Sequence, residues 1–555
     1  MLSAEKKNSY KLISVFCFAF LMYIDKVVGT ESQYIWLITN NLVGVVIAFL
    51  IMSSFSVREF LKPFYLVYSA LGLVGVIGGI AFWYTHQVGH LFAWWATVPI
   101  NVWLLGMIVF KYIEKIIIKK EMKIAFAKWE YVFIACMLLM LLSGSDSVWP
   151  LYYLIVFELL WHAPFSKDQK SEIFVGMLDG VILGFVLLTV YAFFYTPYTQ
   201  VRYRGAYWNC NRNACMYMLA FAAILTKLYM IKDSKGIRKI VLICLSVTSV
   251  GLTLYTGCRT AVLGIAFIIC FYCIAIERRI IKNKWRTIVL KCIAFGALVL
   301  LSVPLLYFPM RYLQEAKGRI GAAVKTVLTG DEVTYRLYGE SYVNFDQAMS
   351  SVLFRFTRSD AETPESKTRV RSRELVQDTE SLSEHNTIES LEDRYTIKYS
   401  FANYPERGIY SFTAPKTFYT GIVSLDHRVN IYLVLIHNLN MTGHLDDELS
   451  IDIISDVPGS DDFRLNNAQN FVLHYLFTYG VPIGLLFLAL FISEVIFLVK
   501  GVNNKRTESI AFLMFAITYL IMGLMEVVWV PGQLVLIVLF VAPFFLTDHG
   551  MTIKE

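Results

Sequence analysis

The chain is poor in charged residues and in residues that interrupt regular structure: 17% of its 555 residues are charged, and it has 14 Pro and 32 Gly. A soluble domain has about 25% charged residues, so this composition argues against a protein that folds in water. The scarcity of Pro and Gly excludes a collagen-like or globally disordered chain. Hydrophobic residues make up 57% of the sequence and the mean hydropathy is +0.55, which predicts a chain surrounded mostly by lipid.

Cysteine is absent from the long polar stretch between residues 310 and 467. All nine cysteines lie in or beside apolar segments, so we expect the polar stretch to fold without disulfides. Cys270 and Cys273 are spaced as in a zinc-binding pair, but no His accompanies them at the spacing of a zinc site. We therefore predict no metal site and interpret both as buried helix residues.

A helix that spans a bilayer needs about 20 mostly apolar residues, and such runs recur along the chain. The candidate spans are 11–29, 34–52, 63–83, 91–113, 130–144, 148–164, 174–195, 212–231, 239–256, 260–276, 287–308, 470–498, 508–527 and 531–547. They predict an all-α, polytopic membrane bundle of about 12–14 transmembrane helices.

Lys and Arg are divided unevenly between the two sets of connections that alternate along these spans. One set holds most of them, whereas the short connections of the other set hold little more than Lys26, Arg202, Arg204 and Arg259. Because cytoplasmic loops are enriched in Lys and Arg, we predict that both termini are cytoplasmic and that the protein lies in the plasma or inner membrane. The same bias accounts for the net charge of +7, so nucleic-acid binding gets no support.

This topology divides the chain into three parts. N-terminal membrane helices occupy residues 1–308, one large extracytoplasmic loop occupies 309–468, and C-terminal membrane helices occupy 469–555. Within the loop, residues 355–398 have little apolar content and no periodicity, which predicts a mobile insert. Residues 425–439 are rich in large apolar side chains and are expected to form a short helix against the membrane.

Two arginines, Arg204 and Arg259, lie at helix ends on the predicted outer face. An arginine at membrane depth is costly and usually has an acidic or anionic partner, and guanidinium suits phosphate because its donors meet two oxygens at once. The alternative is that Arg259 reaches lipid headgroups or pairs with an acid. Taken together, the two arginines favour an anion site.

Two acids within the predicted spans, Glu158 and Asp179, leave open a proton relay, which is typical of a coupled transporter. Both lie within about two turns of a predicted helix end. A solvated or hydrogen-bonded acid is the more frequent explanation there.

Separated sequence patches follow one another between residues 200 and 490. They are Arg204-Gly205, Asn211 opening a helix, Gly257-Cys258-Arg259-Thr260 between two spans, Arg428 and Tyr432 before the turn Asn440-Met441-Thr442-Gly443, and Asn470, Leu473, Gly480 and Gly484 at the re-entry into the membrane. In this order they resemble the O-antigen ligase and O-antigen polymerase superfamily. The two glycines at the re-entry are separated by one residue more than is typical of that family.

The resemblance implies a metal-independent membrane glycosyltransferase with a GT-C-like fold and no cofactor, acting in cell-surface polysaccharide biosynthesis. Its donor would be a glycan on a polyprenyl diphosphate and its acceptor a glycan or lipid-glycan. Other polysaccharide-assembly membrane proteins would be further partners. Carried over by position, the diphosphate-binding residues would be Arg204, Arg259 and Arg428, and the positioning residues would be Asn211, Asn470, Gly480 and Gly484.

The sequence departs from the family's pattern at the position before Asn470. Family members have His there, whereas this chain has Gln469, whose amide cannot accept a proton near neutral pH. His474 stands where family members often have a polar residue such as Gln, so we predict that Gln469 and His474 share the catalytic position. The alternatives are a base among His427, His437 and His444, a reaction that needs no strong base, or loss of activity.

Two other functional classes remain open, a transporter or flippase of lipid-linked sugars and a membrane sensor. A flippase should carry charge along its central cavity and have pseudo-symmetric halves, whereas these arginines lie near one face and the loop breaks the symmetry. A sensor leaves the arginines without an account. Polymerase and ligase differ in their acceptor, which the sequence does not identify.

Overall fold

The computed structural model describes residues 2–28, 33–86, 92–143, 149–232, 236–274, 285–329, 342–353, 394–401, 410–415, 423–444, 449–455, 463–465, 470–525 and 533–546. Regular structure in the described chain is helical up to residue 353 and from residue 470 onward, and a small sheet is formed between them. Gln469 and residues 355–393 of the predicted insert lie outside the described residues.

The helices of the first part are α1 (Leu2–Val28), α2 (Gln33–Met52), α3 (Val57–Phe60), α4 (Pro63–His86), α5 (Phe92–Ile113), the π-helix η2 (Glu114–Ile118), α6 (Lys128–Leu142), α7 (Trp149–Trp161), α8 (Lys167–Tyr195), α9 (Cys210–Met230), α10 (Ile237–Thr256), α11 (Arg259–Tyr272), α13 (Trp285–Thr329) and α14 (Phe345–Leu353). The later helices are α16 (Val423–His437), α17 (Phe471–Tyr479), α18 (Val481–Asn503), α19 (Thr507–Gly523) and α20 (Leu534–Leu546).

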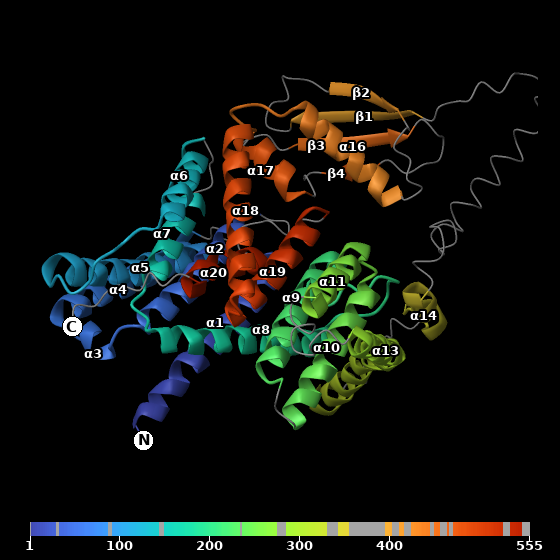
Figure 1. Cartoon of the computed structure of the whole chain (residues 1–555), viewed down its shortest axis with the longest axis horizontal. Coiled ribbons are helices and arrows are strands. Elements are labelled where there is room, and N and C mark those ends of the chain that lie inside the picture. The colour runs from blue at the N-terminus through green and yellow to red at the C-terminus, as the bar shows by residue number, and fades with distance from the viewer. Residues whose placement is uncertain are drawn as a thin grey trace, which may run out of the picture.

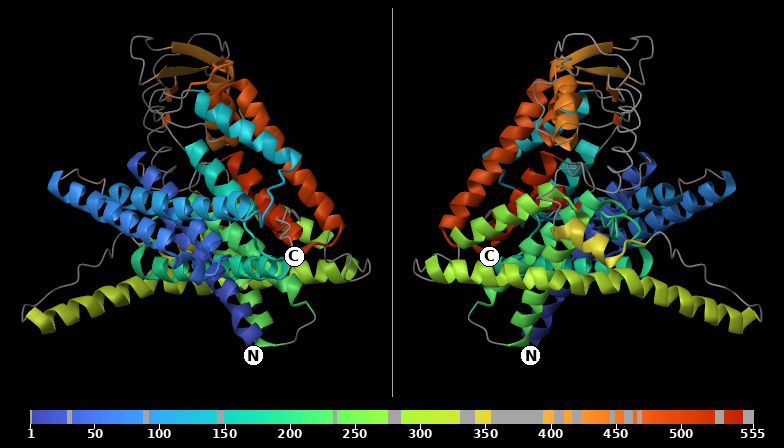
Figure 2. Two further views of the ribbon diagram at one scale, coloured as in Figure 1. Left: turned by 90° about the vertical axis from the view of Figure 1, so that its left-hand side faces the viewer. Right: turned by 90° about the vertical axis from the view of Figure 1, so that its right-hand side faces the viewer.

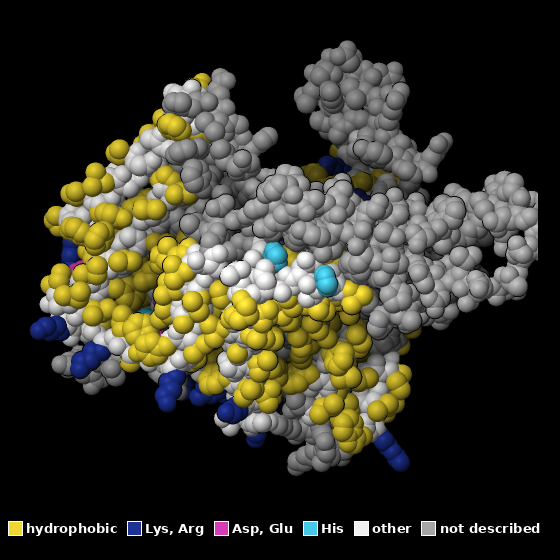
Figure 3. Space-filling view, turned by 90° about the horizontal axis from the view of Figure 1, so that it is seen from above, with side chains coloured by type: hydrophobic (Ala, Val, Ile, Leu, Met, Phe, Trp, Pro, Cys, Tyr) yellow, Lys and Arg dark blue, Asp and Glu magenta, His cyan; other side chains and the backbone are white. Residues whose placement is uncertain are grey.

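Six helices in the described part of the chain are long and apolar enough to cross a membrane, which supports the prediction of a multi-pass membrane protein. They are Pro63–Thr85, Lys167–Tyr195, Cys210–Met230, Ile237–Thr256, Trp285–Ile320 and Val481–Asn503. Shorter apolar helices lie at five of the other predicted spans, namely Asn41–Met52, Trp149–Trp161, Arg259–Tyr272, Thr507–Gly523 and Leu534–Leu546. Hydrophobic side chains cover a broad band of the face shown in Figure 3, as expected for lipid-facing helices.

Helix α13 does not end at residue 308, where the sequence analysis placed the start of the loop. It continues to Thr329 and has 45 residues, which corresponds to about 68 Å and is about twice the thickness of the hydrocarbon core. Pro304 and Pro309 lie inside the helix and do not terminate it. Its C-terminal part projects beyond the neighbouring helices (Figure 2), so a rigid helix leads out of the bundle into the predicted loop.

A four-stranded antiparallel sheet, which the sequence analysis did not predict, is formed within residues 394–465. Its strands are β1 (Arg394–Phe401), β2 (Tyr410–Pro415), β3 (Leu449–Ser455) and β4 (Phe463–Leu465), in the order β2-β1-β3-β4. Residues 394–398 of the predicted mobile insert belong to β1, because aromatic and β-branched residues alternate there with polar ones. The sheet and α16 lie at one end of the molecule, next to α17 (Figure 1), and α16 confirms the predicted helix over 425–439.

Helices α1 and α8 pack closely because α8 has a glycine on every fourth residue of one face. A Cβ at Gly176 or Gly180 would collide with backbone atoms of α1 or lie too close to them. The same face carries Asp179, whose carboxylate binds Lys11 Nζ of α1 at 3.1 Å and Lys227 Nζ of α9 at 2.8 Å. Asp179 therefore joins three helices. Its partners among the described residues are two lysines and not Glu158, with which the sequence left a proton relay open.

Replacing Asp179 by Ala is expected to destabilise the protein by about 3–5 kcal/mol, because Lys227 would remain as a buried charge without its partner. Lys227 is only 2% exposed. Thermal unfolding in detergent, followed by size-exclusion chromatography, measures the change. Asp168→Ala is the matched control, since Asp168 lies exposed in the first turn of the same helix and its loss should cost less than about 1 kcal/mol. Equal effects of the two substitutions would contradict the proposed role of Asp179.

Candidate functional site

The loop that carries Arg204 is hydrogen-bonded to the turn before Arg259. Arg202 donates from Nε to the carbonyl oxygen of Thr256 (3.1 Å), and the backbone N–H of Tyr203 donates to the carbonyl oxygen of Tyr255 (2.9 Å). The C-terminal end of α10 is thus tied to the segment next to Arg204. The structure therefore places the two predicted arginines on neighbouring backbone segments.

Asn211 and Asn213 fix the same loop to the start of α9. Asn211 accepts a hydrogen bond from Arg202 at 2.5 Å, while buried Asn213 donates to the backbone carbonyl oxygen of Arg204 and accepts from the N–H of Tyr207. The cap of α9 is Asn209 rather than Asn211, because its side chain accepts from the first-turn N–H groups. The helix begins one residue before Asn211, at Cys210, and the positioning role of Asn211 stays a prediction.

The arginines near these helix ends have two different kinds of surroundings. Arg202 holds the loop, and Arg212 binds the Asp25 carboxylate at 3.2 Å. By contrast, the side chain of Arg204 is exposed, and no ion pair of its guanidinium is found among the described residues. Arg259 is partly exposed in the first turn of α11.

The N-terminus of α11 adds to the positive potential around Arg259. Its N-cap residue, Cys258, makes no side-chain capping bond, whereas Asn209 caps α9. Backbone N–H groups at a helix N-terminus attract anions, and a cation placed there strengthens the attraction. This helix end and the two arginines form a chemically suitable place for a phosphate group.

A second group of residues meets at the C-terminal end of α19. The amide of Asn470 and the hydroxyl of Tyr432 both donate to the carbonyl oxygen of Leu524, at 3.2 Å and 2.9 Å. Asn470 also caps α17, since its Oδ1 accepts from the N–H of Leu473 at 3.1 Å. Helix α16, the start of α17 and the end of α19 therefore meet at one carbonyl group. Arg428 lies one turn before Tyr432 on α16 and is partly exposed.

The cationic helix end and this junction are close along the bundle. A Cβ added to Gly264 of α11 would lie 3.3 Å from Ile521 of α19. Arg259 is five residues from Gly264, and Leu524 is three residues from Ile521. At 1.5 Å per residue, the two helix ends are separated by at most about 12 Å along the helix axes.

The predicted span 470–498 is broken into α17 and α18 at Gly480, which has φ +88°. The turn 440–443 packs against this break: Val481 N–H donates to the Asn440 carbonyl oxygen at 2.9 Å, and Gly443 has φ +84°. A Cβ on Gly480 would collide with the Met441 carbonyl, and one on Gly443 with the Thr478 carbonyl. The break also explains Gly484, whose added Cβ would lie 2.7 Å from Leu476 Cα on α17.

Gly480→Ala is expected to lower the stability by about 1–3 kcal/mol, because a side chain with positive φ is strained and the added Cβ meets backbone at Met441. The same thermal-unfolding measurement reports it. Gly75→Ala in α4 is the control, since nothing lies within 4 Å of its added Cβ. An unchanged melting temperature for Gly480→Ala would show that the break tolerates a side chain.

Two histidines, His474 and His444, make contacts near the C-terminal end of α17. His474 Nδ1 lies 3.2 Å from the Thr478 hydroxyl, and the His444 ring stacks on Phe477 with 4.4 Å between centroids. The backbone N–H of His444 bonds to the carbonyl oxygens of Phe477 and Thr478 at 2.9 and 3.0 Å. His474 and His444, one of the alternative bases, therefore both contact residues 477–478 of α17.

The other two candidate histidines and Gln469 are described only in part. His437 is the exposed last residue of α16, the side chain of His427 is not described, and Gln469 lies outside the described residues. Thr478 and the Leu524 carbonyl were missed by the sequence analysis. Thr478 lies one helical turn after His474, and this spacing could have predicted their contact. The Leu524 carbonyl group could not be predicted, because every residue has a backbone carbonyl.

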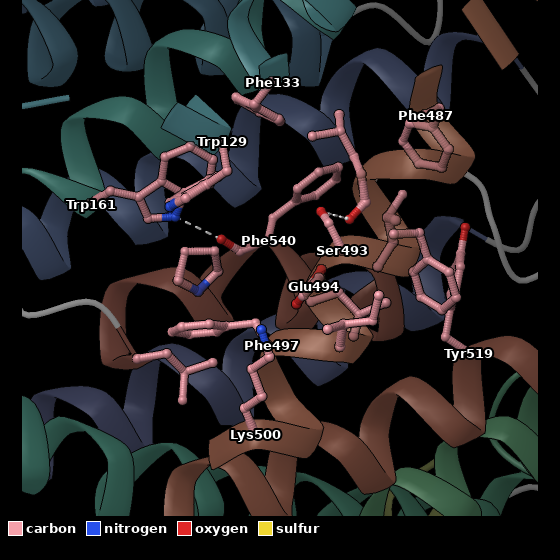
Figure 4. A pocket seen from close by; sticks show the side chains of 17 residues that line it. Trp129, Phe133, Trp161, Phe487, Ser493, Glu494, Phe497, Lys500, Tyr519 and Phe540 are labelled. Carbon is pink, nitrogen blue, oxygen red and sulfur yellow. Dashed lines mark hydrogen bonds between the residues drawn. The ribbon is translucent and has the colours of Figure 1, made fainter. Parts of the chain in front are cut away.

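An apolar cavity of about 390 Å³ lies between α6, α7, α18 and α20 (Figure 4). Its lining is mainly aromatic and aliphatic, with Glu494 and Lys500 as its charged residues. One carboxylate oxygen of Glu494 is buried without a hydrogen-bond partner in the described chain. A carboxylate beside a single lysine does not suit a diphosphate, so the arginine-bearing helix end is the better candidate.

The candidate functional site therefore consists of the arginine-bearing end of α11, the junction at Leu524 and the histidines at α17. In comparisons with known proteins, no protein-family model matches the chain and no curated protein matches its sequence.

Proposed function

We propose that the chain is an integral membrane glycosyltransferase that polymerises or ligates polyprenyl-diphosphate-linked oligosaccharide units in cell-surface polysaccharide biosynthesis. The observation that carries the proposal is the position of Arg259. It lies at a helix N-terminus without a side-chain cap, beside the segment of Arg204 and near the Leu524 junction. A GT-C-like, metal-independent bundle is part of the same proposal.

The transfer step requires little chemistry beyond charge neutralisation and proton removal. The acceptor hydroxyl oxygen attacks the anomeric carbon of the donor, the bond from that carbon to the diphosphate oxygen breaks, and polyprenyl diphosphate leaves with the electron pair. Arg204, Arg259 and, from α16, Arg428 neutralise the charge that develops on the leaving group. A general base takes the hydroxyl proton.

His474 is the base that we propose. Its imidazole lies one turn after Asn470, and its Nδ1 is 3.2 Å from the Thr478 hydroxyl. When the Thr478 hydroxyl oxygen accepts from Nδ1–H, the neutral imidazole keeps a lone pair on Nε2, and Nε2 takes the proton of the acceptor hydroxyl. Gln469, which precedes the cap of α17, would orient the acceptor through its amide.

The proposed orientation has the arginines, the sheet and α16 on the extracytoplasmic side and both termini in the cytoplasm. Lys and Arg gather along one margin of the hydrophobic band in Figure 3. Such an uneven distribution is typical of the cytoplasmic side of a membrane protein. The proposed partners are the lipid-linked donor, a glycan or lipid-glycan acceptor, the bilayer and other polysaccharide-assembly membrane proteins.

Deletion of the coding region, followed by structural analysis of the surface glycan, tests the proposal in cells. Single repeat units at the surface would indicate that a polymerase was lost. Intact polymer that stays on its carrier lipid would indicate that a ligase was lost. A surface glycan with unchanged length, amount and attachment would contradict both versions.

A further inference from the structure

Two glutamates and one histidine converge where α6 begins and α7 ends. Glu130 lies in the first turn of α6, Glu158 lies in the last turn of α7, and His162 directly follows that helix. His162 Nε2 is 3.4 Å from Glu130 Oε2 and 3.5 Å from Glu158 Oε2. The exposed fractions of the side chains are 1% for Glu130, 5% for His162 and 16% for Glu158.

Three polar atoms of this cluster have no hydrogen-bond partner among the described residues. Both carboxylate oxygens of Glu158 and Nε2 of His162 are buried without a hydrogen-bond partner in the described chain. Glu130 Oε2 accepts the N–H of Ala127 at 3.1 Å, and the His162 ring meets the edge or face of Phe126 at 5.1 Å. Buried polar groups normally have partners, so three ligand atoms facing one another require an explanation.

The two distances from His162 Nε2 agree with ligands around one metal ion. The three ligand atoms lie within 4.8 Å of one another. Bonds of about 2.0–2.2 Å at tetrahedral angles place neighbouring ligand atoms about 3.3–3.6 Å apart. The two distances from His162 Nε2 fall in this range, whereas good hydrogen bonds are about 2.7–3.2 Å long.

Charge points to the same ligand class. Two carboxylates that share a buried space repel each other and are costly to desolvate, and one imidazole adds at most a single positive charge. A divalent cation would compensate both carboxylates and use the neutral imidazole as a third ligand. Carboxylate and imidazole together suit first-row transition metals, including Zn²⁺.

We propose that Glu130, Glu158 and His162 bind one divalent transition-metal ion, with Zn²⁺ as the best-fitting candidate and water completing its coordination. The ion joins the first turn of α6 to the end of α7 and stabilises the packing of the two helices. The site differs from the sequence-based expectation of no metal. It lies apart from the residues of the proposed glycosyl transfer. Trp149, at the other end of the 13-residue α7, donates a hydrogen bond to Tyr479 of α17. Trp149 is about 20 Å from His162 along the helix.

The test uses the full chain, purified in detergent through an affinity tag without histidines, stripped with a chelator and then exposed to Zn²⁺. We expect about one Zn²⁺ per chain by elemental analysis and a higher unfolding temperature in the loaded than in the stripped protein. Co²⁺ bound at the same position should show the visible absorption of a low-symmetry, imidazole-containing site. If the wild-type protein does not retain metal, or does not gain thermal stability when it is loaded, the proposal is wrong, and no variant is needed to show it.

His162→Gln and Glu158→Gln identify the site. Each should weaken Zn²⁺ binding at least about 10-fold, since loss even of a residue that only supports a ligand typically costs about 10- to 100-fold. Glu494→Gln is the matched control, because Glu494 is a partly buried glutamate on α18 and its replacement should leave metal binding unchanged. Equal retention of Zn²⁺ by all three variants would place the metal elsewhere. Destabilisation by His162→Gln with no metal dependence would identify an ion pair between protonated His162 and the glutamates instead.

Discussion

Cells that carry Arg259→Ala at normal expression should lose at least about 99% of their glycan-transfer activity, because removal of one preorganised charge-stabilising group typically costs about 100- to 1,000-fold. Arg259 is expected to neutralise the diphosphate as the bond to the sugar breaks. It lies in the first turn of α11, where the helix N-terminus adds to the positive charge of its side chain. The length and amount of the surface polymer, measured by gel electrophoresis and glycan analysis, report the effect.

Two further variants show whether Arg259→Ala loses activity because the guanidinium group itself is missing. Arg259→Lys keeps the charge but loses the paired donors of guanidinium, and it should recover part of the activity. Arg58→Ala removes an exposed arginine on α3 and should leave the polymer unchanged. All variants must elute as folded protein in equal amounts. Unchanged polymer with folded Arg259→Ala would exclude the proposed role of this arginine.

His474→Ala is expected to reduce transfer by about 100- to 10,000-fold, the range typical for loss of a general base. Removal of the ring should change the rate of transfer more than the affinity for the donor. Transfer by purified protein, followed at several donor concentrations, separates these two effects. Gln469→His tests the exchanged positions, and it should raise the activity of His474→Ala if either position can supply the base.

His444→Ala is the matched control because His444 lies beside the same helix. The carbonyl oxygen of Asn438 is 2.7 Å from its Nε2, and its ring lies on Phe477, which indicates that it holds the turn 440–443 in place. We expect this substitution to lower stability more than the rate per folded molecule. A large rate loss with His444→Ala and none with His474→Ala would assign the base to His444.

The membrane helices were predictable because apolar runs of sufficient length have few alternatives. Two helices differ from the predicted spans, and each difference has a specific physical cause. Gly480 breaks the predicted span 470–498 because a turn from residues 440–443 packs against it, and this contact joins positions far apart in the sequence. Helix α13 continues past residue 308 because the more polar residues that follow are supported by ion pairs of Glu315 with Arg311 and Arg319, one helical turn away on either side. The fall in hydropathy at residue 308 marks the end of the apolar run and not the end of the helix.

The sheet was missed because its strands are short and lie within a polar stretch. Strand β1 has a short alternation of polar and apolar residues, and its pairing with β3, in which Ile397 faces Ile453, joins it to a segment about 50 residues later that the sequence does not identify as its partner. The candidate site was partly predictable. Arg204, Arg259, Asn470 and Gly480 carry sequence signals, whereas the joint role of Tyr432 and Asn470 depends on one backbone carbonyl group.

The proposed metal site could not be predicted from the sequence for a different reason. Glu158 and His162 have the spacing of neighbours on one helical face, but Glu130 comes from another helix 28 residues before Glu158. A cluster dominated by carboxylates does not match the spacing of Cys and His that identifies a zinc site in a sequence. Packing of α6 against α7 is what brings the third ligand atom into place.

The most direct test of the central claim is transfer by the purified protein in liposomes that contain a labelled polyprenyl-diphosphate-linked glycan and a matching acceptor. A glycosyltransferase produces a new glycosidic bond and releases polyprenyl diphosphate in equal amounts, and Arg259→Ala stops both. Movement of the labelled glycan lipid across the bilayer, with no new glycosidic bond and no released diphosphate, would contradict this function and identify a transporter.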